Sequence, residues 1–336
     1  MKNISLGVSI LCLLANGLYA VPQPVFNLVI LTNEADAIVV GRIVGSHDSG
    51  PSSRLDPSGR NEQMRTIASD VEVDEVIKGS PLRTLKYRFP MATAGLEQLD
   101  TLLHQERIFF LRQSSDYFEA ASEYYPSVVA VRGVTRGATR PLDRIVEVVG
   151  GVISAPAATA TMKLAAVHTL WGVNSPAAAP PLRRAASDSN VEVRLAAAAA
   201  LLSIDDVGGW PAAAEVLLAH PGTVRADSDV IHDLLVAIAE GVKSTQSIPF
   251  LTRLLRSDDA RTRHAATSAL GHTHSHEAVR PLIQALDDRD QETRLNAVRG
   301  LAEIAGTRDH SPSDDAFRRD PERYVAFWKD WAARQQ

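Results

Sequence analysis

The sequence predicts a chain of two parts, a small β domain followed by a solenoid of stacked helix pairs. Short segments rich in β-branched residues fill roughly the first 130 positions, as is typical of strands. Beyond them an apolar helix, a polar turn and a second helix recur as PLRRAASDSNVEVRLAAAAAL (181–201), FLTRLLRSDDARTRHAATSAL (250–270) and PLIQALDDRDQETRLNAVRGL (281–301). Self-similarity at about 30 to 40 residues indicates a helical solenoid. The composition, 45% hydrophobic and 22% charged, is typical of a folded protein.

The N-terminus has the pattern of an export signal. Met1 and Lys2 precede an apolar run from Ile4 to Leu14, and the small residue Ala20 precedes VPQP. We expect a signal peptide at residues 1–20 and a periplasmic or extracellular mature chain. Cleavage after Gly17 and an uncleaved anchor are the alternatives, although the stretch is short for a bilayer, which needs about 20 apolar residues.

The single cysteine, Cys12, lies inside this segment. Disulfides, cysteine nucleophiles and thiolate metal sites are therefore not expected in the mature chain. The formal net charge of −5 does not favour nucleic acid or an anionic membrane as a partner.

Residues 21–136 are predicted to form a small antiparallel β domain. A long mobile loop is expected at 46–63, which is rich in Ser, Gly, Pro and Asp, and a helix near 96–104. Closing five short strands into a barrel would remove their exposed edges. The five predicted strands are Ala37 to Gly45, Ala68 to Gly79, Thr84 to Pro90, Arg107 to Gln113 and Ser127 to Gly133.

The strand and turn pattern of this domain resembles the small OB-like barrels of exported bacterial envelope proteins. The matching residues are Ala35, Asp36, Gly41, Val76, Lys78, Gly79, Phe110 and Leu111. OB-like barrels include nucleic-acid binders and netrin-like inhibitors, so the fold alone does not define the function. Acidic residues lie among the aromatic ones here, which disfavours nucleic acid, and the cysteines of the netrin-like inhibitors are missing.

A connector is predicted at residues 137–156. It begins as a helix that continues through Val149, and the Gly150-Gly151 pair and Pro156 then break the helical pattern. The solenoid follows at 157–312, and its second helices are expected to start near residues 160, 191, 229, 260 and 291.

Three of the second helices resemble HEAT repeats of the short class related to phycobilin lyases. They read VRLAAAAAL (193–201), TRHAATSALG (262–271) and TRLNAVRGLA (293–302). The two resemblances together predict an OB-like antiparallel β-barrel followed by an α–α superhelical HEAT solenoid. Short polar residues are expected to cap three of the helices at Asn190, Asp259 and Asp290. The HEAT resemblance implies that basic residues at one repeat position tie neighbouring repeats together, namely Lys163, Arg194, Arg263 and Arg294.

A capping helix is predicted within residues 313–336. Asp320 is the expected N-cap, with Pro321 at the first helical position. Four aromatic residues then share one helical face, either to seal the last repeat or to dock a partner: Tyr324, Phe327, Trp328 and Trp331.

Histidines at alternate positions, His272, His274 and His276, form the only cluster suited to chemistry, because imidazoles can chelate a transition metal. A turn between helices is also an ordinary place for polar residues, so we assign no metal, no cofactor and no catalytic residue. A phosphate-binding Gly-rich loop, a GxSxG elbow and an HExxH motif are all missing from the sequence.

These observations predict a non-catalytic, exported scaffold or adaptor that binds a protein partner through the concave surface of the solenoid. Nucleic-acid binding and stable membrane insertion after signal cleavage are not expected. One alternative is a metal-dependent enzyme or accessory protein that uses the turn from His272 to His276. The other is binding of a small ligand, or an inhibitory role, in the N-terminal barrel.

Overall fold

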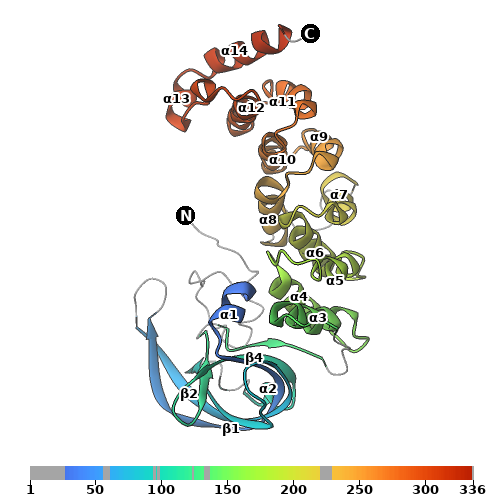
Figure 1. The fold of residues 1–336 in the computed structure, drawn as a ribbon. Helices are drawn as coiled ribbons and strands as arrows, with labels where there is room; N and C mark the ends of the chain where they lie inside the picture. Colours follow the sequence, from blue (N-terminus) through green and yellow to red (C-terminus); the bar gives the residue numbers. More distant parts are fainter. Residues whose placement is uncertain are drawn as a thin grey trace. The chain divides into compact units, whose positions relative to one another are not determined.

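The computed structural model describes residues 27–55, 61–93, 96, 99–122, 125–131, 137–219 and 229–334. The chain divides into two compact units, residues 1–193 and 194–336. A sheet and the first helices belong to the first unit, and the second unit is helical (Figure 1). In the part of the chain that the model describes, no helix has both the length and the apolar character needed to cross a bilayer. The predicted signal segment lies outside the described residues.

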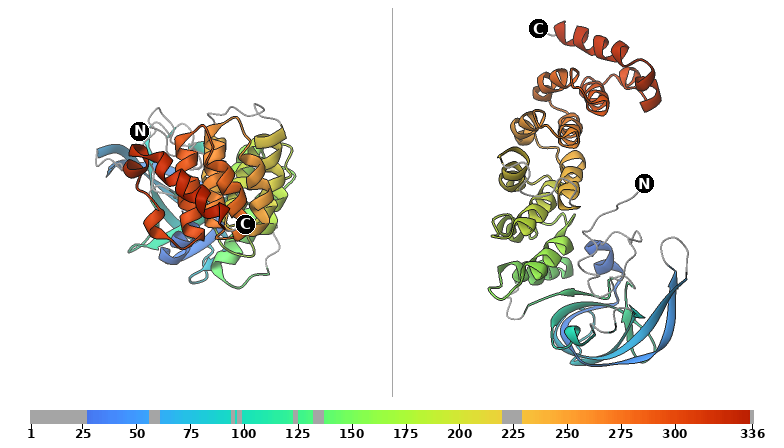
Figure 2. Two further views of the ribbon diagram at one scale, coloured as in Figure 1. Left: turned by 90° about the horizontal axis from the view of Figure 1, so that it is seen from above. Right: turned by 180° about the vertical axis from the view of Figure 1, so that it is seen from behind.

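The sheet has the strand order β1-β2-β3-β5-β4-β6, and β1 also pairs with β4. The pairings therefore lead from β1 through β2, β3, β5 and β4 back to β1, and only the β3–β5 pair is parallel. Figure 2 shows that the strands curve strongly. Apolar side chains of these strands form a buried core. The strands among the described residues are β1 (Ala37–Leu55), β2 (Asn61–Lys78), β3 (Thr84–Ala92), β4 (Glu106–Gln113), β5 (Phe118–Ala120) and β6 (Ser127–Val129).

The prediction of a long mobile loop after the first strand is wrong for most of residues 46–63. β1 and β2 continue as a paired ribbon in which residues 46–55 face residues 61–69. Polar side chains stabilise this ribbon across the strands, as in the pair of Arg65 Nη2 and Asp48 Oδ2 at 2.6 Å. Gly50, with a φ of 130°, lies at an irregularity of the register. The glycine and the polar residues therefore belong to an exposed, bulged ribbon.

The residues that carry the OB-like pattern hold the sheet together. Asp36 Oδ2 accepts the N–H of Gln113 at 2.8 Å, which fixes β1 to the end of β4. A Cβ on Gly41 would lie 2.3 Å from the carbonyl oxygen of Glu72, so only glycine fits at this strand crossing. The ammonium of Lys78 donates to three carbonyls at the end of helix α1 (Leu28–Glu34): those of Thr32, Asn33 and Ala35.

Two short elements were not predicted from the sequence, and a third is shorter than expected. Helix α1 was not predicted, although Asn27 caps it by accepting the N–H of Ile30 at 3.0 Å. The three-residue strand β5 was also missed. The helix expected near 96–104 is the single turn α2 (Leu99–Leu102). Such short segments carry too few residues for a periodic pattern.

The helices after the sheet follow one another in pairs, and the second helices begin at residues 160, 191, 229, 260 and 291, as predicted. The prediction of a sheet domain followed by a helical repeat region is therefore confirmed. Figure 1 shows α8, α10 and α12 in one row, with α7, α9 and α11 in another. The pairs are α3 (Pro141–Ser154) and α4 (Ala160–Leu170), α5 (Ala179–Ala185) and α6 (Val191–Ser203), α7 (Trp210–Ala214) and α8 (Asp229–Val236), α9 (Ile248–Leu254) and α10 (Ala260–His272), and α11 (Val279–Ala285) and α12 (Gln291–Ile304).

The predicted break at Gly150-Gly151 is wrong, because α3 continues through both glycines to Ser154. A Cβ on Gly150 would lie 2.9 Å from the ring of Pro181, so glycine here permits close packing of α5 against α3. The helix is also fastened to the sheet, since Arg144 pairs with Glu75 and donates to the carbonyl of Ile77 at 3.2 Å.

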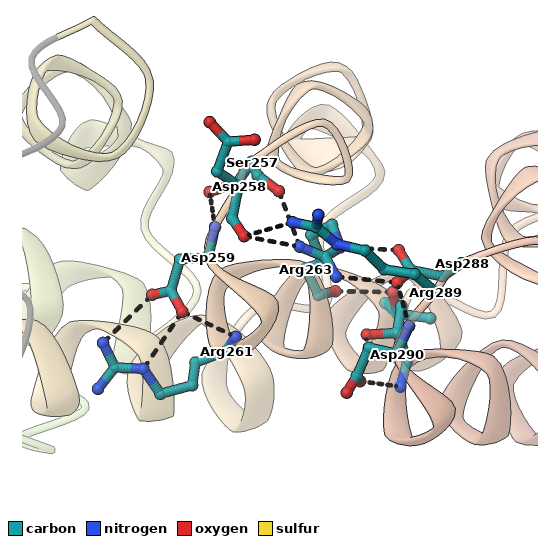
Figure 3. A network of polar contacts seen from close by, with 10 residues as sticks. Ser257, Asp258, Asp259, Arg261, Arg263, Asp288, Arg289 and Asp290 are labelled. Carbon is teal, nitrogen blue, oxygen red and sulfur yellow. Dashed lines mark hydrogen bonds and ion pairs between the residues drawn. The ribbon is translucent and has the colours of Figure 1, made fainter.

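Arg263 connects two successive helix pairs through a buried network (Figure 3). Its side chain donates to both oxygens of Asp288, from Nε to Oδ2 at 2.7 Å and from Nη2 to Oδ1 at 2.9 Å. Nη1 donates to the carbonyls of Ser257 and Asp258 at 2.9 and 3.1 Å. Asp288 Oδ1 also accepts the N–H of Asp290, the residue that caps α12. One guanidinium thus joins the turn before α10 to the turn before α12.

Basic residues at the same repeat position in other pairs also contact carboxylates that follow them in the chain. The contact of Lys163 is short, and its partner Asp188 lies two residues before the cap of α6, as Asp288 lies two residues before the cap of α12. The contact of Arg194 is longer, and the partner of Arg294 is more exposed. The three pairs are Lys163 Nζ with Asp188 Oδ2 at 2.6 Å, Arg194 Nη2 with Glu215 Oε1 at 3.5 Å, and Arg294 Nη1 with Glu322 Oε1 at 2.9 Å.

Acid is expected to weaken the Lys163 contact. The hydrogen bond from Lys163, followed by that from the N–H of Asn190, lowers the pKa of Asp188. A carboxyl whose pKa is lowered by folding stabilises the fold above its unfolded pKa of about 3.9, and this stabilisation is lost as the pH falls through the folded value. We therefore expect Asp188→Asn to be less stable than the parent chain at pH 7, with the difference shrinking below about pH 4. Thermal melts from pH 7 to pH 3 measure this difference in stability. A difference that grows in acid would contradict the stabilising role of the charged Asp188.

The C-terminal segment forms two helices, α13 (Asp314–Arg319) and α14 (Pro321–Ala333). Asp320 accepts the N–H of Arg323 at 3.3 Å and caps α14, as predicted. The aromatic stripe packs within the unit, because Trp328 is fully buried and α14 contacts α11 and α12.

Candidate functional site

A groove of about 960 Å³ runs over the second helices α10 and α12. The first helices α9 and α11 pack against these two helices and cover their apolar sides, while the groove face stays open. The lining comes from both second helices and from the segments that follow them: Ser268, Gly271, His272, His274, Asn296, Arg299, Gly300, Glu303, Gly306 and Ser311.

Two glycines form the floor of the groove. A Cβ on Gly271 would lie 2.8 Å from the Cα of Gly300, and one on Gly300 would lie 3.0 Å from the Cα of Gly271. The backbones of α10 and α12 therefore touch at this point, and no side chain rises from it. The groove exists because both helices carry a glycine where they cross.

His272 is held on the wall of the groove by a neighbouring helix. The helix α8 ends in a π-helical turn, η5 (Ala237–Gly241), and its carbonyl of Ala239 lies 2.9 Å from His272 Nδ1. Because a carbonyl oxygen can only accept, Nδ1 carries the proton of this hydrogen bond, and Nε2 can accept from a ligand when it carries no proton itself. Ser268 Oγ donates to the same carbonyl at 3.4 Å. The irregular turn thus supplies one backbone oxygen that orients two groove residues.

Arg299 is fixed on the opposite side, in α12. Its Nε and Nη2 donate to the carbonyl of Pro312 at 3.2 and 3.1 Å, and Nη2 also pairs with Asp314 Oδ1 at 2.5 Å. The hydrogen bond from Arg299 lowers the pKa of the Asp314 carboxyl, with a further contribution from the charge of Arg299. The guanidinium is therefore held in one orientation, and the segment after α12 is held against the helix.

The three histidines predicted as weak metal candidates occupy different settings. His272 and His274 both line the groove, whereas His276 is exposed at the start of the 3₁₀ turn η7 (His276–Ala278). His274 has a φ of 48° and its Nε2 lies 3.7 Å from Glu303 Oε1. Among the residues described, no three His, Cys, Asp or Glu side chains are grouped so that they could hold a metal ion.

Most of the groove residues were not predicted from the sequence. Asn296 and Arg299 lie inside the repeat segment TRLNAVRGLA and Glu303 follows it, so all three resemble ordinary polar positions of a repeat helix. One signal was present, because Ser268 and Arg299 are 31 residues apart and so occupy the same repeat position. Polar residues at the same position of successive repeats are expected on the same face of the stacked helices, which predicts Ser268 and Arg299 on one surface.

Comparison with known families agrees with the helical architecture. Residues 155–228 and 222–302 match the family model of HEAT repeats. The prediction of HEAT repeats is therefore confirmed for residues 155–302. No curated protein matches the chain.

Proposed function

We propose that this chain, with HEAT repeats over residues 155–302, is an exported, non-catalytic scaffold that binds a protein partner through the groove over α10 and α12. HEAT repeats commonly mediate protein–protein interactions, and stacked repeats offer extended binding surfaces. The observation that carries the proposal is an open groove whose polar side chains are already oriented by backbone carbonyls. Side chains that are ordered before binding lose less conformational entropy when a partner arrives.

The chemistry of the groove suits a polypeptide segment. His272 offers a ring nitrogen as an acceptor, and the amide of Asn296 can both donate and accept, so the two can bond the C=O and N–H groups of a partner backbone. Arg299 and Glu303 carry opposite charges within the same lining. This mixture favours a partner segment of mixed polarity over a polyanion. The bare floor at Gly271 and Gly300 allows a partner backbone to approach closely.

Two features of the sequence support the remaining parts of the proposal. The basic start, apolar run and small residue at positions 1–20 support export. The lack of catalytic motifs in the sequence supports a non-catalytic role.

We further infer that the sheet domain is a closed OB-like barrel. The circuit of pairings β1-β2-β3-β5-β4-β1, together with the parallel pairing of β3 and β5, supports it.

Filling the groove is expected to weaken partner binding strongly. The substitution Asn296→Trp places a large side chain in the groove, and we expect it to reduce capture of the partner at least tenfold, since the bulky ring occupies the space that the partner would fill. The measurement is an affinity pull-down from a cell-envelope extract, using the full-length chain as bait. Circular dichroism of each variant checks that the repeats remain folded.

Gln284→Trp is the matched control, because Gln284 is exposed on the first helix α11 and does not line the groove. A protein captured by the parent chain and by Gln284→Trp but lost with Asn296→Trp supports the proposal. Equal capture by all three baits, or a hydrolytic activity of the purified chain with no captured partner, contradicts it.

A further inference from the structure

A second cavity, of about 380 Å³, lies on the sheet domain. Side chains of β3 alternate across the sheet, so that Tyr87 and Phe89 are buried in the core while Arg88 is exposed on the other face. The cavity opens on this second face. Its chemistry is dominated by arginines and hydroxyls: Ser52, Arg54, Thr66, Arg88, Arg112 and Tyr117.

Two of these arginines flank the cavity from the strands on either side of β5. Arg88 of β3 and Arg112 of β4 are both in register with Glu119 of β5, which lies between them. Two strand spacings of about 4.8 Å separate their Cα atoms by roughly 10 Å, so both guanidinium groups can reach one ligand. Within the described residues neither forms an ion pair, whereas Arg65 pairs with Asp48 on the same sheet. Arg88 and Arg112 therefore keep their N–H groups free of a direct ion pair, and with Glu119 as the one carboxylate of the lining the arginines give the cavity an excess of positive charge.

Tyr117 organises the site. The guanidinium of Arg88 lies over its ring, 3.8 Å from the ring centroid. Stacking on an aromatic face holds the plane of a guanidinium while leaving its N–H edges available for a ligand. The hydroxyl of Tyr117 donates to Glu119 Oε1 at 3.1 Å, which engages the one carboxylate in the lining.

Hydroxyl groups complete the donor set. The hydroxyl oxygen of Ser52 is buried and has no hydrogen-bond partner among the described residues. A buried polar group without a partner costs free energy, which a ligand would recover once the Ser52 side chain turns toward the cavity. Ser53 and Thr66 add further hydroxyls to the lining. Donors thus come from the β1–β2 side as well as from the arginines of β3 and β4, and they are not confined to one plane.

From this arrangement we propose that the cavity between Arg88, Arg112 and Ser52 binds a tetrahedral oxyanion, the phosphate or sulfate group of an ester. Guanidinium forks and hydroxyls are the donors that recognise such groups. A planar carboxylate would use only one plane of this donor set. The ester can be a small soluble molecule or a lipid headgroup, because both carry the tetrahedral oxyanion that the arginines and hydroxyls bind.

The test is calorimetric titration of the full-length chain at fixed ionic strength with inorganic phosphate, sulfate, glycerol 3-phosphate and, as the planar anion, acetate. We expect saturable binding of glycerol 3-phosphate that is tighter than that of acetate. Arg88→Gln and Arg112→Gln are each expected to weaken it by on the order of tenfold, the effect of losing a charge-assisted hydrogen bond. Arg83→Gln is the matched control, because Arg83 is exposed on the same domain outside the cavity, and it is expected to bind within about twofold of the parent chain.

A parallel arm uses vesicles containing phosphatidylglycerol. Vesicle binding that Arg112→Gln abolishes and Arg83→Gln preserves assigns the ester to a lipid headgroup and supports the proposal. Three results overturn it: no saturable binding of any of the phosphate or sulfate probes, acetate binding as tight as glycerol 3-phosphate, or an equal loss with Arg83→Gln and Arg112→Gln.

Discussion

Arg263→Ala is expected to lower the free energy of unfolding by about 3–5 kcal/mol, the cost of breaking a buried ion pair by removing one partner. Arg263 is only 4% exposed, and its guanidinium bonds both oxygens of Asp288 and two backbone carbonyls. Burial raises the pKa of Asp288, but the hydrogen bonds from Arg263 and from the N–H of Asp290 outweigh it, and the pKa lies below its ordinary value. The carboxylate is therefore charged in the fold and loses its main counter-charge in the variant. Urea denaturation followed by circular dichroism measures the loss.

Arg294→Ala is the matched control, since Arg294 occupies the same repeat position one pair later. Its partner Glu322 is 75% exposed, so the pair is expected to contribute about 1 kcal/mol or less. A double-mutant cycle of Arg263→Ala with Asp288→Ala isolates the pair, and removing both partners is expected to cost less than the sum of the single losses. If Arg263→Ala were no more destabilising than Arg294→Ala, the network in Figure 3 would not be what joins these repeats.

Trp328→Ala is expected to cost about 3–5 kcal/mol, the range for truncating a fully buried large side chain. Trp328 is 0% exposed and meets the rings of Phe327 and Trp331 edge-on, with centroids 5.2 and 5.3 Å away. Its Nε1 donates to the carbonyl of His310 at 3.4 Å, and that His310 ring stacks on Phe327. The truncation therefore leaves a cavity between α14 and the helices that it covers. Thermal and urea unfolding of the variant measure the effect.

Trp331→Ala serves as the control on the same helix, because Trp331 is half-buried. It is expected to cost roughly 1–2 kcal/mol, in proportion to the smaller area that it buries. The comparison also decides between the two interpretations of the aromatic stripe. A stripe that seals the last repeat makes Trp328 the more costly loss, whereas a docking stripe would leave stability unchanged and reduce only partner binding.

Local sequence signals located the repeats because helix starts depend on neighbouring residues. Asn190, Asp259 and Asp290 accept N–H groups two or three positions further on, so a short polar residue before an apolar run sufficed to place three helices. The recurring leucines were also predictable, and Leu182, Leu251 and Leu301 are fully buried. The apolar spacing of a helix defines the face that must pack.

Predictions based on glycine and short polar residues were wrong at two places where distant segments pack together. Gly150 was predicted to break a helix, and it instead lies inside α3 where Pro181 packs against it. The polar stretch after the first strand was predicted to be a loop, and it instead pairs with β2 along a ribbon. In both cases a contact with another segment of the chain outweighs the local preference.

The sequence by itself determined that a strand-rich domain precedes stacked helix pairs, where each second helix begins, and which side of it is apolar. It did so because caps and periodicity are properties of a few neighbouring residues. Only the tertiary structure decided which polar side chains share a surface. The groove needs Gly271 to meet Gly300 and His272 to reach the carbonyl of Ala239, and the sheet cavity needs Arg88 and Arg112 on strands joined through β5. These are encounters between distant segments, and they arise only when apolar faces pack and strands find their register.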